Sequence, residues 1–512
     1  MDGVAIEIAV DGPAIETATN GPAIETTTDG AAVEQEFARV RRAASPRFSP
    51  PPTPLRSRLI HGAVLAVWVL LFARAFGGGG VFAWSAGLAY IGYDTVLLAF
   101  VFVQTLPLLR PAPAAGGVLL PTTVIVAAHN EAATLPVTLA ALFAQASPAD
   151  TVLVADDGST DATAALLLRD YGLVPPPPGT LGPRSPVQPA LRWLRLPQGG
   201  KAQALNVACG LAETELVLTV DADTLLDPQA LGAMQAAFAA DPALVAATGV
   251  LTPACGPTVS GRLLEWFQAY EYVRNFLSRY AWARVDGLLL ISGAFACYRR
   301  TALVAVGGFD PDCLVEDYEL THRMRDQAVR RGLVWRTGVV GGAHARTDAP
   351  ATPAAFLRQR RRWFGGFLQT QLWYRHMVGN PRYGRLGTAM LPVKAIDTMQ
   401  PVYGLTGVVL LLWALAHGSF DVVLPVAGVI GAKLLLDIAF YLWSLHLYRL
   451  WLGRPTGLSL GPALLAALIE PFTFQILRHG GAALGWVSFL TGSRSWGATT
   501  RQGVVAQAED RA

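Results

Sequence analysis

The fold is decided by three short apolar runs: TTVIVAAHN at Thr122–Asn130, TVLVADDG at Thr151–Gly158 and ELVLTVDAD at Glu215–Asp223. Each run is rich in β-branched residues and ends in polar ones, which is typical of a buried strand. Amphipathic segments at Ala132–Gln145 and Ala202–Leu211 lie between the runs. Strands that alternate with helices need crossover connections, so this order predicts an α/β domain with a mostly parallel sheet. The polar residues then fall at the carboxyl ends of the strands, where such sheets bind ligands.

The composition of the 512-residue chain is that of a membrane protein, because 52% of it is hydrophobic and only 15% is charged. Charged residues lie mostly between about residues 120 and 395, which predicts a soluble domain between apolar segments. Runs near the ~20 residues that cross a bilayer occur at Leu59–Phe76, within Val81–Leu109, and at Val402–His417, Val422–Leu447 and Leu458–Leu490. The last run is too long for one simple span and is interrupted by Glu470 and Pro471. It could form one span with a re-entrant piece, or a tight pair.

The N-terminal region contains a nine-residue repeat at residues 3–37: GVAIEIAVD, GPAIETATN, GPAIETTTD and a degenerate GAAVEQEFA. Units this short cannot bury a core, so we expect a disordered acidic tail. The acidic start and the late first apolar run argue against a signal peptide. A basic Pro-rich linker follows, with Arg39, Arg41, Arg42, Arg47, Arg56 and Arg58. By the positive-inside tendency this end stays cytoplasmic, and two crossings return the chain to the cytosol.

Several function classes receive no support from the charges and cysteines. A formal net charge of +3 gives no case for nucleic acid as a partner. The basic residues are nearly all arginine, and with abundant Ala, Gly and Pro this is a hint of a GC-rich bacterial genome. The cysteines show no metal-binding spacing, so we expect buried small hydrophobes at Cys209, Cys255, Cys297 and Cys313.

Two acidic clusters follow predicted strands. Asp221 and Asp223 flank one alanine, and two such carboxylates can hold Mg²⁺ or Mn²⁺ against a diphosphate, although a solvated loop or helix cap has the same pattern. The position after a strand favours the metal site. Asp156 and Asp157 open an acidic turn that leads into a helix capped by Ser159 or Thr160. A carboxylate in that turn can also accept hydrogen bonds from a base or ribose.

A glycine-rich segment, GGKAQALN at Gly199–Asn206, places one of only three lysines at a helix start. A compact ammonium at a helix N-terminus suits a phosphate. The segment lacks the G-x-x-x-x-G-K-[ST] pattern, so it is not a P-loop, and Lys201 could also be an incidental surface lysine.

A further acidic pair, Glu316 and Asp317, begins an apparent helix. Transfer of a sugar to a hydroxyl needs a base, and neighbouring carboxylates raise one another's pKa, which suits either of them to that task. The alternative is an acidic helix N-terminus with no chemical role.

The segment Gln359–Trp363 reads QRRRW within an amphipathic run at Phe356–Tyr374 that leads towards the membrane. It could be a basic, aromatic interfacial helix. That alternative accounts poorly for the glutamine, so we favour an acceptor platform, with an aromatic face for a sugar ring and polar side chains around it.

Taken in order, these segments resemble the family 2 inverting β-glycosyltransferases, the group that contains cellulose, chitin, hyaluronan and poly-N-acetylglucosamine synthases. The resemblance covers about Thr122–Phe367 and the flanking spans. The family pattern of separate aspartates followed by Q-x-x-R-W is matched by Asp157, Asp221, Asp223, Asp317, Gln359, Arg362 and Trp363.

On the donor side, the resemblance implies that Glu131 and Asp157 contact the nucleoside, with Asp156 close by. Lys201 and Asp221 would face the diphosphate, and Asp221 and Asp223 the metal. The implied fold is GT-A, a Rossmann-like α/β domain inserted between transmembrane helices.

On the acceptor side, the resemblance implies that Asp317 is the general base, with Glu316 beside it. Ser292 and Gly293 lie in a segment similar to the acceptor-end loop, and Gln359, Arg362 and Trp363 would hold a growing chain. Two departures stand out. His129 takes the place of a frequent tyrosine, and Gly249–Pro253 matches neither the hyaluronan or chitin pattern nor, fully, the cellulose one.

The sequence therefore predicts a multi-pass enzyme of the bacterial inner membrane with a cytoplasmic catalytic domain. It would transfer glucose or N-acetylglucosamine from a UDP-sugar to a growing polysaccharide, or a single sugar to a lipid. A membrane scaffold or transporter is a third hypothesis, since Asp94, Lys433, Asp437 and Glu470 are ionisable residues in apolar runs. Lys433 and Asp437, four apart, are expected to neutralise each other. The sequence identifies no accessory export subunit.

The expected domains are residues 1–57 (tail and linker), 58–110 (two transmembrane helices), 118–350 (catalytic domain), 351–390 (interface helices), 391–492 (three to four transmembrane or re-entrant segments) and 493–512 (polar tail).

Overall fold

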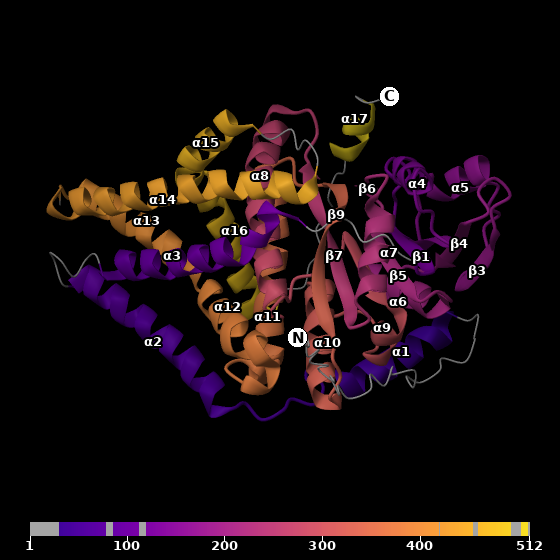
Figure 1. Ribbon diagram of the computed structural model, residues 1–512, viewed down its shortest axis with the longest axis horizontal. Helices are drawn as coiled ribbons and strands as arrows, with labels where there is room; N and C mark the ends of the chain where they lie inside the picture. Colours follow the sequence, from indigo (N-terminus) through magenta and orange to yellow (C-terminus); the bar gives the residue numbers. More distant parts are fainter. Residues whose placement is uncertain are drawn as a thin grey trace, which may run out of the picture.

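The computed structural model describes residues 30–77, 85–111, 119–418, 420–453, 459–492 and 503–509. Its centre is one mixed sheet with the strand order β3-β4-β2-β1-β5-β8-β7-β9-β6 (Figure 1). The strands of the described chain are β1 (Thr122–Ala128), β2 (Thr151–Asp157), β3 (Thr180–Arg184), β4 (Leu191–Leu196), β5 (Leu216–Asp221), β6 (Thr224–Leu226), β7 (Leu244–Ala254), β8 (Phe295–Arg299) and β9 (Arg336–Asp348).

The three apolar runs of the sequence form β1, β2 and β5, and they pair in parallel as expected. The pairs β2–β4 and β7–β9 are also parallel, whereas β3–β4, β5–β8, β7–β8 and β6–β9 are antiparallel. The expected α/β domain is confirmed, but the expectation of a mostly parallel sheet is wrong. The antiparallel strand β8 separates the parallel strands of the first half from β7 and β9.

The sheet is buried on both faces, as the continuous apolar runs predict. Val124 and Val126 of β1 belong to one hydrophobic cluster, and Ile125 between them belongs to another. Helices cover the two faces: α4 (Leu135–Phe143), α5 (Thr163–Tyr171), α6 (Lys201–Leu211), α7 (Ala230–Ala240), α8 (Val259–Arg284), α9 (Arg300–Ala305) and α10 (Glu316–Arg331).

The N-terminal segment corrects the sequence prediction, because residues 30–44 form helix α1 (Gly30–Ala44) rather than a disordered tail. Val33 and Phe37 are buried in the cluster that includes residues of α6. Arg41 donates hydrogen bonds to the carbonyl oxygens of Gly307 and Phe309, both at 3.0 Å. The degenerate last repeat thus forms the start of a helix that packs against helix α6 and the loop at Gly307–Phe309. The other repeats lie outside the described residues.

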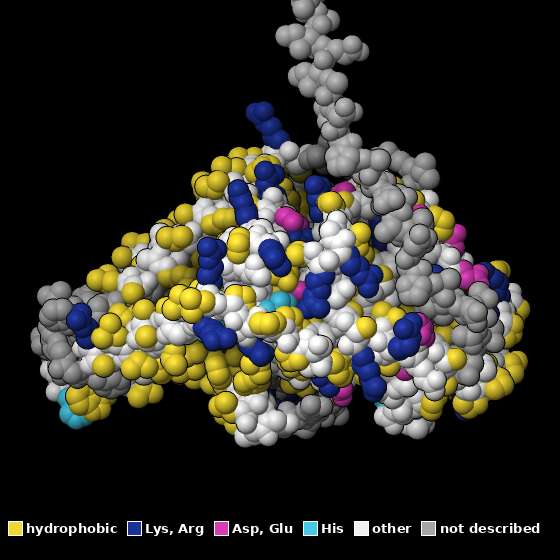
Figure 2. All heavy atoms as spheres, turned by 90° about the horizontal axis from the view of Figure 1, so that it is seen from below, with side chains coloured by type: hydrophobic (Ala, Val, Ile, Leu, Met, Phe, Trp, Pro, Cys, Tyr) yellow, Lys and Arg dark blue, Asp and Glu magenta, His cyan; other side chains and the backbone are white. Residues whose placement is uncertain are grey.

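Apolar helices extend to one side of the sheet (Figure 1). They and the segments that connect them are α2 (Leu55–Gly77), α3 (Ser85–Thr105), η2 (Leu106–Leu109), α11 (Pro353–Trp373), η3 (Arg375–Met377), η4 (Pro381–Tyr383), η5 (Leu386–Met390), α12 (Leu391–Asp397), α13 (Gln400–Ala416), α14 (Phe420–Leu452), α15 (Leu460–Ile469), η6 (Glu470–Phe472) and α16 (Phe474–Thr491). Seen from below, the arm they form is mostly hydrophobic, whereas Lys and Arg side chains gather nearer the middle of the molecule (Figure 2).

Three segments of the described chain are long and apolar enough to cross a membrane: Leu88–Leu109, Leu386–Ala416 and Ile430–Leu452. A fourth is added if the pair Leu460–Phe472 and Phe474–Thr491, bent by 48°, counts as one span. The expected first span at residues 59–76 lies on α2, which is not among these segments, and side chains near the end of that helix lie outside the described residues. The chain is therefore expected to be an integral membrane protein.

Charged residues that the sequence places in apolar runs form ion pairs. Lys433 forms an ion pair with Asp437 on its own helix, as expected, and also with Asp94 of α3 at 2.7 Å. Glu470 is buried and pairs with Arg274 of α8. It stands where Pro471 interrupts the last apolar run, because proline lacks the N–H that would continue a helix.

The cysteines and the C-terminal segment were also the subject of predictions. The four cysteines are free thiols and are buried, as predicted. The segment expected as a polar C-terminal tail contains helix α17 (Gly503–Glu509), whose Val504 packs with Leu225 and Ala254.

Candidate active site

The candidate site lies at the sheet edge where β1, β2 and β5 end. The parallel register pairs Ala127 with Asp221 and Ala128 with Asp156, so the polar residues after these strands face the same edge. Strand β8 runs antiparallel to β5 and begins at that edge, where the backbone N–H of Asp221 donates to the carbonyl of Ala294 at 3.2 Å. The topology therefore gathers residues from distant parts of the sequence.

The residues predicted to contact the nucleoside are close together and buried, but their carboxylates already have protein partners. Glu131 accepts from the Thr134 hydroxyl at 2.8 Å. Asp156 accepts from the Ser159 backbone N–H at 2.9 Å and from the Trp193 indole at 3.3 Å. These bonds hold the two loops that follow β1 and β2.

Asp157 organises the loop that precedes α6. Its carboxylate accepts the backbone N–H groups of Gly199 at 2.7 Å and of Gly200 at 2.9 and 3.1 Å. Gly200 has φ of 94°, a left-handed conformation that glycine adopts without strain. Burial raises the pKa of Asp157, and the glycine N–H groups oppose that rise. The carboxylate thereby fixes the residues immediately before Lys201.

Lys201 lies at the junction of the predicted donor and acceptor sides. Its ammonium Nζ is 2.5 Å from Asp221 Oδ1 and 3.9 Å from Glu316 Oε1. Burial disfavours its charge, but the carboxylates of Asp221 and Glu316 outweigh this effect and raise the pKa of Lys201 above its ordinary value. The lysine is therefore held by carboxylates from β5 and α10.

Asp223 is a buried carboxylate with other carboxylates nearby. Burial raises its pKa well above the ordinary value, and the charges of Asp221 and Asp348 raise it further. Such a cluster is stabilised by a cation, and oxygen ligands suit Mg²⁺ or Mn²⁺. In the described chain no group of three or more His, Cys, Asp or Glu is arranged to hold a metal ion. Two aspartates would leave the remaining ligand positions to phosphate oxygens and water.

Asp317 begins helix α10 and is held by the loop before β8. The backbone N–H of Gly293 donates to its Oδ2 at 2.7 Å, and a Cβ at Gly293 would lie 3.1 Å from the same oxygen. Ser292 lies next to this contact, and its carbonyl accepts the Phe295 N–H at 3.1 Å. Burial raises the pKa of Glu316, while Lys201 lowers it and Asp317 raises it. The structure thus brings Lys201, Asp221, Gly293, Glu316 and Asp317 together.

The Gln359–Trp363 segment lies on α11. The side chain of Arg362 donates to the Leu314 carbonyl at 3.2 Å and its charge lowers the pKa of Glu316, so it belongs to this site. Trp363 is half-buried beside the cluster that contains Tyr318. Gln359 Oε1 is buried and finds no hydrogen-bond partner among the described residues. A buried amide oxygen that lacks a protein partner usually accepts a hydrogen bond from water or from a ligand.

Sequence reasoning missed the residue that fixes this segment. Arg360 donates to both carboxylate oxygens of Glu271 on α8, at 2.8 and 2.7 Å, and both side chains are buried. The Arg360 guanidinium also lies 4.6 Å from the Trp363 ring. The acidic partner could not be recognised in the sequence because 89 residues separate the two. Sequence reasoning also missed Asp348 at the end of β9. Its charge acts on the pKa of Asp223, although the two residues lie far apart in the chain.

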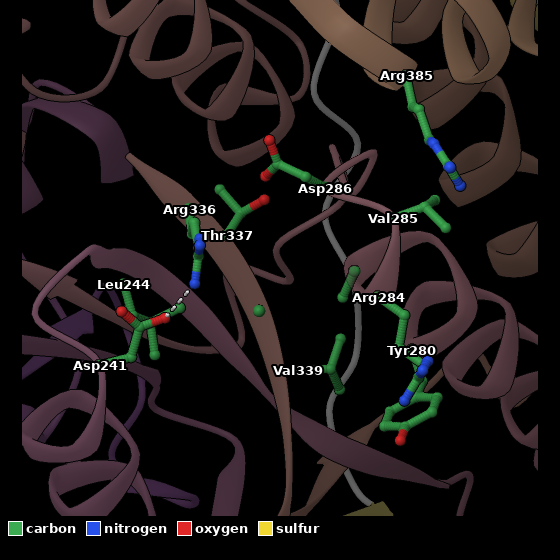
Figure 3. Close-up of a pocket in the computed structure, with 12 residues that line it drawn as sticks. Asp241, Leu244, Tyr280, Arg284, Val285, Asp286, Arg336, Thr337, Val339 and Arg385 are labelled. Atoms are coloured by element: carbon green, nitrogen blue, oxygen red, sulfur yellow. Dashed lines mark ion pairs between the residues drawn. The ribbon is translucent and has the colours of Figure 1, made fainter. Parts of the chain in front are cut away.

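A cavity of about 690 Å³ lies away from the predicted site (Figure 3). It is lined by Leu244 and Arg336, the first residues of β7 and β9, and by Tyr280, Arg284 and Arg385. Because β7 and β5 run in the same direction, this cavity opens at the edge opposite to the ends of β1, β2 and β5. None of the predicted site residues lines it.

Comparison with known proteins agrees with the family resemblance. Residues 121–366 match the model described as "Glycosyltransferase like family 2". The chain is 27% identical over 256 residues to the poly-β-1,6-N-acetyl-D-glucosamine synthase of Staphylococcus epidermidis, covering 47% of this chain and 53% of that protein. It is 26% identical over 257 residues to the same-named synthase of Staphylococcus aureus, covering 48% and 54%. The chain thus spans about half the length of these relatives.

Among solved structures, a mannosyltransferase from Pyrobaculum calidifontis in complex with GDP-mannose and Mn²⁺ matches with a TM-score of 0.49 and 21% identity, covering 81% of this chain and 99% of that one.

Proposed function

The chain is an enzyme with a family 2 glycosyltransferase domain in residues 121–366, and from this premise we propose that it transfers a sugar from a UDP-sugar to a hydroxyl with inversion. The observation that carries this proposal is the position of Lys201. Its ammonium contacts Asp221 on the donor side and approaches Glu316, next to Asp317, on the acceptor side. This position supports a role in which the cation neutralises the charge that develops on a diphosphate leaving group.

The proposed reaction is a single displacement. Asp317 accepts the proton of an acceptor hydroxyl, and that oxygen forms a bond to the anomeric carbon of the donor sugar. The bond from this carbon to the diphosphate oxygen breaks, and UDP leaves with the electron pair. Lys201 neutralises the charge that develops on the diphosphate, and the Gly293 N–H orients the Asp317 carboxylate. One displacement converts the α linkage of the donor to β.

Mg²⁺ or Mn²⁺ fits the donor side, where the Asp223 carboxylate is buried next to Asp221. We propose that these two aspartates hold the ion, which when bound supplies positive charge to the diphosphate oxygens. Glu131, Asp156 and Asp157 would position the nucleoside through the loops that they stabilise.

A growing polysaccharide is our proposed acceptor. The unpartnered Oε1 of Gln359 and the half-buried Trp363 ring, both on α11, suit the hydroxyls and the apolar face of a sugar. The name of the Staphylococcus relatives favours UDP-N-acetylglucosamine as the donor, with UDP-glucose next.

Transfer of one sugar to a lipid uses the same carboxylates and is the second candidate, because α11, which carries Arg362 and Trp363, packs on the apolar helix α16. A scaffold or transporter without turnover would not need Lys201 and the carboxylates in contact.

We further propose that the chain resides in a bacterial inner membrane with its catalytic domain in the cytoplasm, where nucleotide sugars are made. Residues 118–350 would form that domain, and residues 351–390 would lie at the membrane surface.

The experiment is transfer from a panel of labelled UDP-sugars by the purified full-length chain, with products sized by gel and mass spectrometry. We expect incorporation from UDP-N-acetylglucosamine or UDP-glucose into long products that β-specific glycosidases digest. Only a singly glycosylated lipid would replace the first candidate with the second. No incorporation from any UDP-sugar would contradict the proposal.

A further inference from the structure

The cavity at the sheet edge opposite to the candidate active site is lined by more basic than acidic side chains (Figure 3). Its volume of about 690 Å³ lies within the range of ~300 to 1,000 Å³ that is usual for small-molecule sites. Three arginines line it: Arg336 at the start of β9, Arg284 in the last turn of α8 and Arg385 just before η5. The lining therefore combines cations from three separate parts of the fold.

Both aspartates of the lining already have an arginine partner. Asp241 lies 3.5 Å from Arg336, the ion pair that is drawn in Figure 3. Asp286 accepts a hydrogen bond of 2.6 Å from Arg325, a residue of α10 that does not line the cavity. These two acids are therefore already engaged and leave the other arginines of the lining without a counter-charge.

Arg284 and Arg385 are those two arginines. Both side chains are exposed, and neither forms a hydrogen bond or an ion pair with another described residue. They are far apart in the sequence, so it is the fold that places two uncompensated cations at one cavity. A planar guanidinium group binds phosphate oxygens through paired N–H groups. A phosphate is therefore the chemical group that suits this pair.

The cavity lies where two candidate membrane spans meet the α/β domain. Arg385 directly precedes the span Leu386–Ala416. The Tyr280 ring lies 5.2 Å from the ring of Trp451, which stands one residue before the end of the span Ile430–Leu452. Tyrosine and tryptophan are enriched at the boundary between a bilayer and water, and arginine flanks membrane spans there. The headgroup of a lipid in that membrane face is therefore within reach of the lining.

We propose that this cavity binds the phosphate group of an anionic ligand at the membrane surface, with Arg284 and Arg385 as the phosphate-binding residues. The ligand is the headgroup of an anionic lipid, or a soluble phosphate ester with the same glycerol phosphate group. The bound phosphate links the last turn of α8 to the segment that enters the membrane, and so fixes the α/β domain on its apolar helices. The inference does not depend on the donor sugar or on the role of Asp317.

The first arm of the test uses the full-length chain in nanodiscs of phosphatidylcholine with and without phosphatidylglycerol. Phosphatidylglycerol should raise the melting temperature of the wild type by about 2 to 4 °C, a shift typical of a ligand at several times its dissociation constant. The double variant Arg284→Gln, Arg385→Gln should lose this shift. In phosphatidylcholine alone it should melt with the wild type, because both side chains are exposed and unpaired.

The matched control is Arg382→Gln, an exposed arginine of η4 that does not line the cavity. It removes a positive charge three residues before Arg385. If the cavity rather than the general basic surface binds the lipid, this variant should keep the full shift in melting temperature.

The second arm adds glycerol 3-phosphate to nanodiscs of phosphatidylcholine alone. A stabilisation that the double variant loses would identify a soluble phosphate ester as the ligand, whereas a response to phosphatidylglycerol alone would identify the lipid. An equal response of the wild type and the double variant to phosphatidylglycerol, with none to glycerol 3-phosphate, would place lipid binding elsewhere and overturn the inference. The absence of any response of the wild type to either compound would overturn it as well.

Discussion

Gly293 illustrates how closely the loop before β8 approaches Asp317. An added Cβ would meet Asp317 Oδ2 at 3.1 Å and Asp317 Cβ at 3.3 Å, so the carboxylate would have to shift by a few tenths of an ångström. Small misplacements at a reacting centre can cost about 10²-fold in rate. We predict that Gly293→Ala lowers kcat of sugar transfer by about 10- to 100-fold.

The control for this substitution is Gly407→Ala, where an added Cβ meets nothing within 4 Å. It should leave kcat near the wild-type value. The melting temperature of Gly293→Ala should stay close to that of the wild type, since the substitution adds one methyl group. Full activity of Gly293→Ala would contradict the close contact between the loop and Asp317.

His322 gives a prediction for stability against pH. Burial lowers its pKa to about 4, although its Nδ1 lies 2.9 Å from the Tyr318 carbonyl, a hydrogen bond that favours the charged form. The ordinary value is about 6.5. The unfolded chain therefore binds a proton that the folded chain does not between about pH 6.5 and 4. This contribution to stability is complete above pH 6.5 and is lost as the pH falls towards 4. It amounts to about 3 kcal/mol.

The measurement is the denaturant midpoint of the purified chain between pH 7.5 and 4.5. The wild type should lose stability as the pH falls, and His322→Gln, which cannot take up the proton, should lose clearly less. Parallel curves for the two proteins would mean that His322 titrates normally in the folded state.

At the scale of single residues, the sequence nominated the residues of the candidate site but did not show how they are bonded. Lys201, Asp221 and Asp317 were recognisable because ammonium and carboxylate groups at strand or helix ends suit sugar transfer. That Asp157 binds the Gly199 and Gly200 N–H groups was not predictable, because these partners lie more than 40 residues away.

At the scale of elements, helix α1 is the clearest difference between the sequence prediction and the structure. A nine-residue repeat predicts disorder when each unit is considered alone, because it cannot bury a core. Val33 and Phe37 nevertheless find apolar surface on α6, where Gly210 leaves no room for a Cβ beside Val33. The helix also contacts both the C-terminal part of α6, at Gly210, and the loop at Gly307–Phe309 that leads towards α10.

We predict that Phe37→Ala destabilises the chain by about 3 to 5 kcal/mol, the usual cost of emptying a buried phenylalanine site. Because α1 packs on α6, the KM for the UDP-sugar should rise as well. Thermal unfolding and donor kinetics measure the two effects. Glu36→Gln, which removes an exposed ion pair with Arg39 on the same helix, is the control and should change neither. Unchanged stability of Phe37→Ala would show that α1 does not dock in solution.

The directions of the strands could be predicted from the sequence only in part. Alternating strands and helices predicted parallel pairing correctly for β1, β2 and β5. Strand β8 enters between β5 and β7 after the long helix α8, and its direction follows from tertiary packing rather than from its own sequence. The same strand brings Gly293 to the site, so the acceptor side was less predictable than the donor side.

For the whole molecule, the sequence predicted apolar segments before and after a more charged domain, and the structure has long apolar helices at one side of the α/β sheet (Figure 1). The break at Glu470 and Pro471 was visible in the sequence, but its partner Arg274 was not. How the helices pack depends on partly buried ion pairs such as Lys433 with Asp94, which join helices far apart in the chain.

Chain extension is a property of the whole molecule, and a substitution at Gln359 can test whether this chain performs it. If its unpartnered Oε1 accepts a hydroxyl of the growing chain, Gln359→Ala should shorten the products several-fold while the rate of first-sugar transfer changes less. Product length distributions measured with excess donor give the result. As a control, Gln229→Ala replaces a glutamine at the start of α7, away from α11, and should leave the lengths unchanged. A proportional loss of initial rate without shorter products would assign Gln359 to catalysis or structure instead.

The central claim is that Asp317 takes the acceptor proton in an inverting transfer from a UDP-sugar. It is tested most directly by single-turnover transfer with Asp317→Asn, alongside UDP binding by calorimetry. Asparagine keeps the shape and can still accept the Gly293 N–H, but it cannot take a proton. We predict a loss of at least about 10²-fold in the transfer rate, the low end of the contribution of a general base, with UDP affinity unchanged. Transfer at a rate near that of the wild type would contradict the account.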